Sequence, residues 1–216
     1  MILRHLIDYE FVMNRAFKIS LLVFAVLFAA LMLRPSSPSI RNSEPEGENI
    51  ICFGDSLTSG TGASDGMDYP SQLSRMLSIP VINAGAAGDT TGKALLRLER
   101  DVLSRSPKIV LITLGGNDLK NRVPKQEAFE NLGKIIESIQ EKGALVVVGG
   151  LDFKMYGRGF GEQYRKVAEE TGSVLIENVF EGIMGEKALM SDPIHPNDKG
   201  YTVMAERFKE AIEPYI

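Results

Sequence analysis

The feature that most constrains the fold is an alternation of short apolar runs with longer segments of helical periodicity. The apolar runs, which we predict to be strands, cover residues 49–53, 81–82, 109–114, 144–148 and 174–176. The helical segments cover residues 70–77, 91–103, 125–141, 161–171 and 197–212. Runs that are continuously apolar are typical of strands covered on both faces. Five repeats of strand then helix therefore predict an α/β fold with a parallel five-stranded sheet and helices on both sides.

Composition excludes several classes of protein. Of the 216 residues, 44% are hydrophobic and 24% are charged, which is the balance of a globular chain. The formal net charge of -4 argues against a nucleic-acid partner, because such proteins usually present a basic face. The single cysteine, Cys52, excludes an intrachain disulfide, and we expect it to be core. The chain has two histidines, His5 and His195, and only His195 lies in the predicted domain. One cysteine and one histidine are too few for a Cys/His structural zinc site.

The N-terminal part of the chain differs from the rest. Residues 19–33 are apolar except for Ser20, follow Arg15 and Lys18, and end at Arg34. A basic flank before a short apolar run predicts a signal peptide or membrane anchor over residues 1–33. We expect export to the periplasm or outside the cell, with the domain either released by cleavage or tethered to the membrane by residues 16–33. A buried core helix is the alternative, but the polar sequence after the run fits it poorly.

Two further boundaries follow from composition. Residues 34–48 are rich in Pro, Ser and Glu, which predicts a solvated linker. The remaining residues, 49–216, are long enough to bury one sizeable core and form one domain. Met13 is a more typical start for the basic region of a signal than Met1, and we expect it to be the initiator.

Polar and glycine-rich segments come directly after the predicted strands. They cover residues 54–57, 84–89 and 115–118, with a further segment at 192–196 before the last helix. Ligands of parallel sheets bind outside the carboxyl ends of the strands. These four segments are therefore expected to form the functional edge of the domain.

The residues in these segments suggest nucleophilic catalysis. Asp192 lies three residues before His195 in a proline-bracketed turn, where its carboxylate can accept from Nδ1–H and leave Nε2 free as a base. Ser56 follows the first strand and needs such a base to act as a nucleophile. The amide of Asn117 and the backbone N–H groups of Gly88 and Ser56 can donate to an oxyanion. Singly, each is equally a turn or capping residue, and their joint placement carries the hypothesis.

These segments resemble the GDSL, or SGNH, hydrolase superfamily. The resemblance rests on Gly54-Asp55-Ser56-Leu57, Gly88, Gly115-Gly116-Asn117-Asp118 and Asp192-Pro193-Ile194-His195-Pro196, and it runs from about Ile50 to Phe208. Within this superfamily, the chain most resembles the group of bacterial arylesterases, lysophospholipases and acyl-CoA thioesterases. The resemblance implies a flavodoxin-like three-layer α/β/α sandwich, a Ser56–His195–Asp192 triad and an oxyanion hole of Ser56, Gly88 and Asn117. It implies no metal ion and no organic cofactor.

Other segments carry weaker expectations. Residues 149–161 hold glycines and the side chains Phe153, Met155 and Tyr156, which predicts a loop lining an acyl-binding groove together with Leu57 and Ile194. Packing of the aromatic side chains on the sheet edge is the alternative. The charged stretch over residues 93–105 is interpreted as a solvated helix face. Residues 92–94 lack the Ser or Thr of a phosphate-binding loop, which we reject.

The expected function is hydrolysis of small or medium acyl esters, with thioesters and lysophospholipids among the candidate substrates, by a monomeric serine esterase through an acyl-serine intermediate. A carbohydrate O-acetyl esterase with the same machinery is one alternative. A non-catalytic lipid- or glycan-binding protein held at the membrane is the other, although a binding module has no need of this set of residues. We expect membrane contact only through the N-terminal segment, if it is uncleaved.

Overall fold

The computed structural model describes residues 17, 20, 22–24, 39–152 and 159–216. The chain separates into two units, residues 1–39 and 40–216. In the first unit, residues 17, 20 and 22–24 are helical, and their apolar side chains, such as Phe17, are exposed. The predicted signal or anchor over residues 1–33 otherwise lies outside the described residues. No helix within the described part of the chain is both long and apolar enough to cross a membrane.

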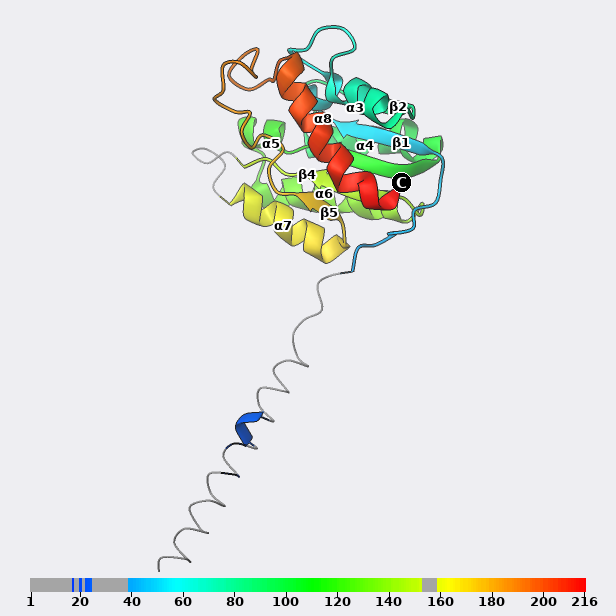
Figure 1. The fold of residues 1–216 in the computed structure, drawn as a ribbon, viewed down its shortest axis with the longest axis vertical. Helices are drawn as coiled ribbons and strands as arrows, with labels where there is room; N and C mark the ends of the chain where they lie inside the picture. The colour runs from blue at the N-terminus through cyan, green and yellow to red at the C-terminus, as the bar shows by residue number, and fades with distance from the viewer. Residues whose placement is uncertain (1–16, 18–19, 21, 25–38, 153–158) are drawn as a thin grey trace, which may run out of the picture. The chain divides into compact units, whose positions relative to one another are not determined.

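The second unit is built on one parallel five-stranded sheet, which confirms the predicted class (Figure 1). Its strands are β1 (Asn49–Gly54), β2 (Val81–Gly85), β3 (Pro107–Thr113), β4 (Leu145–Gly149) and β5 (Val174–Ile176). They are ordered β2-β1-β3-β4-β5. The central strands β1, β3 and β4 are almost entirely buried, as their continuously apolar sequences require. The edge strands β2 and β5 are only partly buried.

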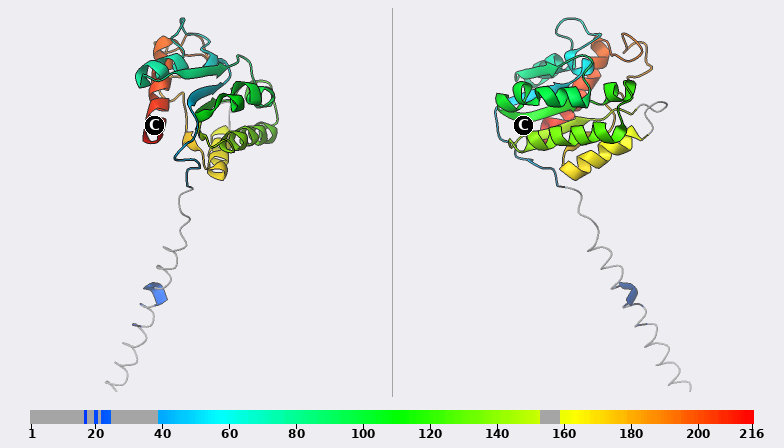
Figure 2. Two further views of the ribbon diagram at one scale, coloured as in Figure 1. Left: turned by 90° about the vertical axis from the view of Figure 1, so that its right-hand side faces the viewer. Right: turned by 180° about the vertical axis from the view of Figure 1, so that it is seen from behind.

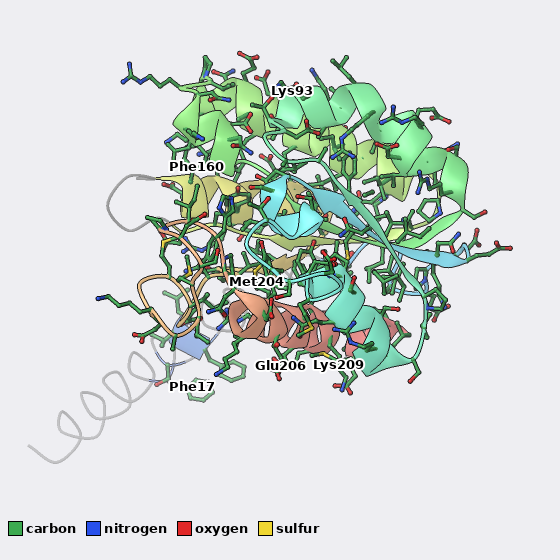
Figure 3. The ribbon with its side chains drawn as sticks, turned by 90° about the horizontal axis from the view of Figure 1, so that it is seen from above. Phe17, Lys93, Phe160, Met204, Glu206 and Lys209 are labelled. Atoms are coloured by element: carbon green, nitrogen blue, oxygen red, sulfur yellow. The ribbon has the colours of Figure 1, made fainter. Side chains whose placement is uncertain are left out.

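Helices cover both faces of this sheet (Figure 2). On one face lie α3 (Tyr69–Leu77) and α8 (Asp198–Ile212), which contact each other. On the other lie α4 (Thr91–Asp101), α6 (Lys125–Gln140) and α7 (Phe160–Thr171). Figure 3 shows the two layers from above, with Lys93 of α4 on one outer side and Glu206 and Lys209 of α8 on the other. This is the three-layer sandwich that the resemblance implies.

The predicted elements agree with the structure except at some ends. The predicted helix over residues 91–103 stops at Asp101, because Val102 leaves helical geometry and a 3₁₀ turn, η1 (Leu103–Arg105), comes next. Two short helices, α2 (Ser56–Ser59) and α5 (Gly116–Lys120), were not expected from the sequence. Each is too short to show helical periodicity. Both begin where a strand of the sheet ends.

Residues 40–48, which composition assigns to the linker, are hydrogen-bonded to the rest of the second unit. Arg41 N donates to Gly172 O at 2.8 Å, and Glu48 N donates to Ser106 O at 2.9 Å. The Asn42 amide donates to Gln140 O and Ala144 O, each at 2.9 Å. These acceptors precede β3, β4 and β5. A polar segment can therefore lie along the amino-terminal edge of the sheet without contributing much apolar surface.

The strand order places a candidate site at the carboxyl-terminal edge of the sheet, opposite residues 40–48. In an open parallel sheet, the crevice opens where the order reverses, outside the carboxyl ends of the strands. Here the reversal falls between β1 and β3, which pair from Ile50 with Ile109 to Gly54 with Thr113. The helices α2 and α5 begin at these two strand ends. Residues 54–57 and 115–118 are thereby brought together.

Candidate active site

Ser56 is placed by the short helix α2 immediately after β1. Asp55 is the N-cap of this helix, and its Oδ1 accepts from Leu57 N at 3.0 Å. The helix packs closely on the sheet, because a Cβ on Gly54 would overlap Thr58 and a Cβ on Gly85 would overlap the backbone of Ser59. These two glycines therefore allow α2 to sit against the ends of β1 and β2.

A cluster of buried hydroxyl groups lies under this helix. Thr58 Oγ1 is within hydrogen-bond distance of Tyr69 OH, at 3.0 Å, and of Thr113 Oγ1. All three side chains are fully buried. The hydroxyl groups satisfy one another away from water, so the cluster ties α2 to α3 and β3.

His195 lies between Ser56 and Asp192. Its Nε2 is 3.1 Å from Ser56 Oγ, and its Nδ1 is 2.6 Å from Asp192 Oδ2. The other carboxylate oxygen of Asp192 accepts from Ile194 N at 2.8 Å and from His195 N at 2.9 Å. The hydrogen bond from His195, supported by the N–H of Ile194, lowers the pKa of the Asp192 carboxyl to about 2. A charged Asp192 favours the tautomer with Nδ1 protonated and Nε2 free to accept from the serine.

The turn that carries these two residues is closed at both ends. Met190 and Pro196 form an antiparallel bridge, and Ser191 N donates to His195 O at 2.9 Å. Asn197 is the N-cap of α8, and its side chain also donates to Ala188 O at 3.0 Å. His195 is therefore held by a compact turn rather than by a helix or strand.

The expected oxyanion donors lie after the ends of three neighbouring strands. Ser56 follows β1, Gly88 follows β2 and Asn117 is in α5 after β3. Gly88 has a φ of +83°, and a Cβ there would meet nothing within 4 Å. Asn117 Nδ2 donates to Asp55 Oδ2 at 3.2 Å and to Asp89 O at 3.0 Å. Both hydrogens of the Asn117 amide therefore have a protein acceptor.

Asp55 is a site residue that the sequence reasoning missed. Its side chain is buried beside Ser56 and touches both α2 and Asn117. Burial raises the pKa of the Asp55 carboxyl from 3.8 to about 6, although the N–H of Leu57 and the nearby His195 act in the opposite direction. Its place between a strand and a serine was the available signal, since a residue there can cap a following helix.

A cleft of about 540 Å³ opens beside the serine. Ser56, His195 and Asn117 line it. The apolar lining side chains are Leu57, Leu119, Leu151, Phe180 and Ile194. Two of the expected substrate contacts, Leu57 and Ile194, therefore line the cleft. The other three, Phe153, Met155 and Tyr156, lie outside the described residues.

A second cleft, of about 600 Å³, runs between α6 and α7 and shares no lining residue with the first. Lysine, glutamate and glutamine side chains make up much of its wall, with Phe129 and Val167 among them. It holds no serine, cysteine or histidine. Across the described part of the chain, no group of three or more His, Cys, Asp or Glu side chains is arranged to hold a metal ion.

Comparisons with known proteins agree with this geometry. The model of the GDSL-like Lipase/Acylhydrolase family matches residues 52–203. An arylesterase of Vibrio mimicus is 32% identical over 170 residues, which cover 74% of this chain and 85% of that protein. The thioesterase 1/protease 1/lysophospholipase L1 of Escherichia coli K12 is 26% identical, over 78% of this chain and 85% of its own length. A lipoprotein of Bacillus subtilis, YqeF, is 36% identical over 110 residues, which are 44% of this chain and 45% of that protein.

Solved structures show the same arrangement. The crystal structure of TesA superposes with a TM-score of 0.74 at 25% identity, covering 78% of this chain and all of that one. AlinE4, an esterase of the SGNH-hydrolase family, superposes with a TM-score of 0.63 at 31% identity, covering 77% of this chain and 94% of that one. The residues that the family model matches include Ser56, Asn117 and His195. The chain belongs to the GDSL-like lipase/acylhydrolase family.

Proposed function

We propose that this protein hydrolyses carboxylic acyl esters through an acyl-enzyme formed on Ser56. The observation that carries the proposal is the hydrogen-bonded chain from Asp192 through His195 to Ser56, with its two links at 2.6 and 3.1 Å. A serine hydroxyl is a weak nucleophile until a base accepts its proton. In this chain the base, its orienting carboxylate and the serine are already in contact.

In the first half of the reaction, Ser56 Oγ attacks the acyl carbonyl carbon while His195 Nε2 takes the hydroxyl proton. The imidazolium that forms is stabilised by Asp192, which keeps its negative charge. His195 then gives the proton to the leaving-group oxygen as the carbon–oxygen bond breaks. In the second half, His195 takes a proton from water as the water oxygen attacks the carbonyl carbon of acyl-Ser56. The bond between this carbon and Ser56 Oγ then breaks, His195 returns the proton to Oγ, and the acid is released.

The tetrahedral intermediates need donors for their oxyanion. We assign this role to the backbone N–H groups of Ser56 and Gly88 and to the Asn117 amide. One of the two Asn117 amide hydrogens has to turn from its present acceptor to the oxyanion. The longer bond, at 3.2 Å to Asp55, is the one expected to yield, while the 3.0 Å bond to Asp89 O keeps the amide in place.

The apolar wall of the cleft favours an acyl chain over a sugar ring as the group next to the reacting carbon. A sugar presents several hydroxyl groups that need hydrogen-bond partners when they are buried. The five apolar side chains of the cleft offer none, and apart from Asp55 and the proposed catalytic residues only Lys120 offers a polar side chain. We therefore favour small or medium acyl esters, including lysophospholipids and thioesters, over acetylated carbohydrate.

We also propose that the enzyme acts outside the cytoplasm. The support is the basic flank and apolar run over residues 15–33, together with a relative that is named a lipoprotein. Whether the segment is removed or retained as an anchor is decided by the mass of the mature N-terminus in a membrane fraction and a soluble fraction.

The test is a series of p-nitrophenyl esters from acetyl to long acyl chains, hydrolysed by residues 40–216 and by the same chain with Ser56→Ala. We expect turnover with an optimum above acetyl, and its near-complete loss in the variant. Turnover that survives in the variant contradicts the proposed nucleophile. Activity on acetylated xylan or glucose but on no longer ester points to the carbohydrate alternative. Tight ligand binding by a folded chain without any turnover points to the binding protein.

A further inference from the structure

Arg97 makes an unusual number of contacts for a residue that does not line the cleft. It lies on α4, and its side chain is 12% exposed. Its Nε donates to Asp89 Oδ2 at 2.6 Å, and its Nη1 donates to Ala84 O at 2.8 Å and to Asp101 Oδ2 at 3.0 Å. Its Nη2 donates to Gly54 O at 2.8 Å. The guanidinium also lies 4.4 Å from the centre of the Phe53 ring.

Three of the four residues that accept these bonds, all but Asp101, belong to the segments that carry the proposed oxyanion donors. Gly54 is separated from Ser56 only by Asp55. Asp89 directly follows Gly88, and its own carbonyl oxygen accepts from the Asn117 amide. Ala84 lies near the end of β2, at the start of the same segment as Gly88. A single guanidinium therefore joins the loop after β1 to the loop after β2, and through Asp89 it reaches Asn117.

We propose that Arg97 is a positioning residue that holds Ser56, Gly88 and Asn117 in the relative arrangement that an oxyanion requires. It acts through the loops and does not touch the substrate. The inference rests on the proposed function, since it concerns the donors assigned there. The interpretation of residues 93–105 as a solvated helix face is wrong for this side chain and for Asp101, which is also buried.

The chemistry of the side chain suits this task. Two backbone carbonyls and two carboxylates converge on one planar group, and only arginine offers five donors in a fixed fork. A lysine ammonium keeps the charge but has three donors around one nitrogen. It can reach only some of the four acceptors. Arg97→Lys therefore separates the effect of geometry from the effect of charge.

The helix supplies a matched control three residues further along. Arg100 also binds the Asp101 carboxylate, with its Nε at 2.7 Å, but its side chain is 76% exposed. Asp101 belongs to α4, and in the described structure the Arg100 side chain bonds to none of the three acceptors of Arg97 that lie outside this helix. Arg100→Met therefore removes an arginine from the same helix and the same carboxylate while leaving both loops untouched.

The experiment measures ester hydrolysis by the whole 216-residue chain in detergent for the wild type and for Arg97→Met, Arg97→Lys and Arg100→Met. A displacement of about 1 Å of groups at a reacting centre can lower a rate by about 100-fold. We expect kcat to fall by about 10- to 100-fold in Arg97→Met, with KM within about twofold, and Arg97→Lys to recover only part of the loss. Arg100→Met stays within about twofold of wild type. Full recovery in Arg97→Lys, or an unchanged kcat in folded Arg97→Met, overturns the proposal.

Two readouts separate positioning from a general loss of stability. Hydrogen exchange measured by mass spectrometry is expected to rise in residues 54–59 and 84–89 of Arg97→Met, and not in β4 or α7. In Arg97→Ala, guanidinium ion at low millimolar concentration is expected to raise kcat by at least about fivefold over the same variant without it. Sodium chloride at the same concentration is the ionic control. A uniform rise in exchange without rescue overturns the proposal and leaves Arg97 a purely structural residue.

These readouts also distinguish this inference from the proposed function. If the wild-type chain hydrolyses no ester, the proposed function fails, and hydrogen exchange alone decides the role of Arg97. Faster exchange confined to the two loops then still supports the positioning role. Unchanged exchange in those loops overturns it.

Discussion

At the scale of single residues, the two oxygens of Asp192 have different tasks. Oδ1 accepts from two backbone N–H groups, and Oδ2 accepts from His195 Nδ1. In Asp192→Asn the amide oxygen is expected to keep the backbone bonds, which leaves the NH₂ group facing Nδ1. The imidazole then carries its proton on Nε2 and cannot accept from Ser56. We expect kcat to fall by about 10²- to 10⁴-fold with little change in KM, measured by steady-state ester hydrolysis.

Asp65→Asn provides the control for this substitution, because Asp65 is an exposed aspartate outside the proposed triad. It should leave kcat unchanged. If Asp192→Asn retains more than about a tenth of the wild-type kcat, His195 does not depend on this carboxylate for its tautomer.

Asp55 gives a prediction for stability against pH. Its pKa of about 6 in the folded chain exceeds the ordinary value of 3.8, chiefly because of burial. Between these values the folded chain binds more protons than the unfolded chain, so the free energy of unfolding falls as pH rises. The full difference corresponds to about 3 kcal/mol. Asp55→Asn cannot titrate, so its stability relative to wild type should rise by up to about this amount between pH 4 and pH 7.

Urea unfolding of both chains at several pH values measures this difference. Other carboxyl groups titrate equally in both chains and cancel in the comparison. A difference that stays constant over this range would mean that Asp55 remains charged in the folded protein down to pH 4.

The sequence predicted that Ser56, His195 and Asp192 come together, and the structure places them in hydrogen-bond contact. These residues and the proposed donors could be predicted because each comes after a strand end or lies in a proline-bracketed turn, where ligand-binding groups of parallel sheets gather. The sequence did not identify Asp55 or Arg97 as important. A capping aspartate and a helix-face arginine are common on any surface. Their roles depend on which carbonyl groups and amides lie opposite them, and only the packing of α2, α4 and α5 on the sheet decides that.

At the scale of elements, several loops that follow the strands turn at glycines whose backbone is left-handed. Gly88 and Gly182 form a matched pair, with φ of +83° and +68° and nothing within 4 Å of an added Cβ. Alanine at either position is therefore strained but not obstructed, at a cost of about 1–2 kcal/mol. Both Gly88→Ala and Gly182→Ala should lose this much stability by thermal unfolding.

Only Gly88→Ala is expected to lose activity, because its loop carries a proposed oxyanion donor. We expect its kcat to fall at least about tenfold, while Gly182→Ala stays near wild type in the same ester assay. Equal activity in the two variants would remove Gly88 from the oxyanion hole.

The limits of prediction at this scale are set by the length of each element. Every helix of nine residues or more was expected from periodicity, with ends that differ by one or two residues. The four-residue α2 and five-residue α5 were not, since a single turn shows no repeat. Yet these two turns carry Ser56 and Asn117. Site geometry was thus inferred from the residues at the end of each strand rather than from the turns themselves.

At the scale of the whole molecule, residues 40–48 lie across the amino-terminal ends of β3, β4 and β5, at the opposite edge of the sheet from the cleft. Composition suggested a solvated linker, because the segment offers little apolar surface beyond Ile40, which packs partly against the core. Its attachment instead uses backbone groups and the Asn42 amide. Such contacts leave no periodic pattern in a sequence.

The position of this segment predicts that stability and activity separate. Shortening the chain from 40–216 to 49–216 removes several hydrogen bonds of about 0.5–1.5 kcal/mol each. We expect a loss of about 2–4 kcal/mol, which lowers Tm by about 5–15 °C for a chain of this size. Asn42→Ala in the longer chain should lose about 1–2 kcal/mol. Because the cleft lies at the other edge, kcat at 25 °C should be equal in all three chains. If the truncation leaves Tm unchanged, residues 40–48 are the solvated linker that their composition suggests. If kcat falls together with Tm, this edge of the sheet and the proposed active site are coupled through the sheet.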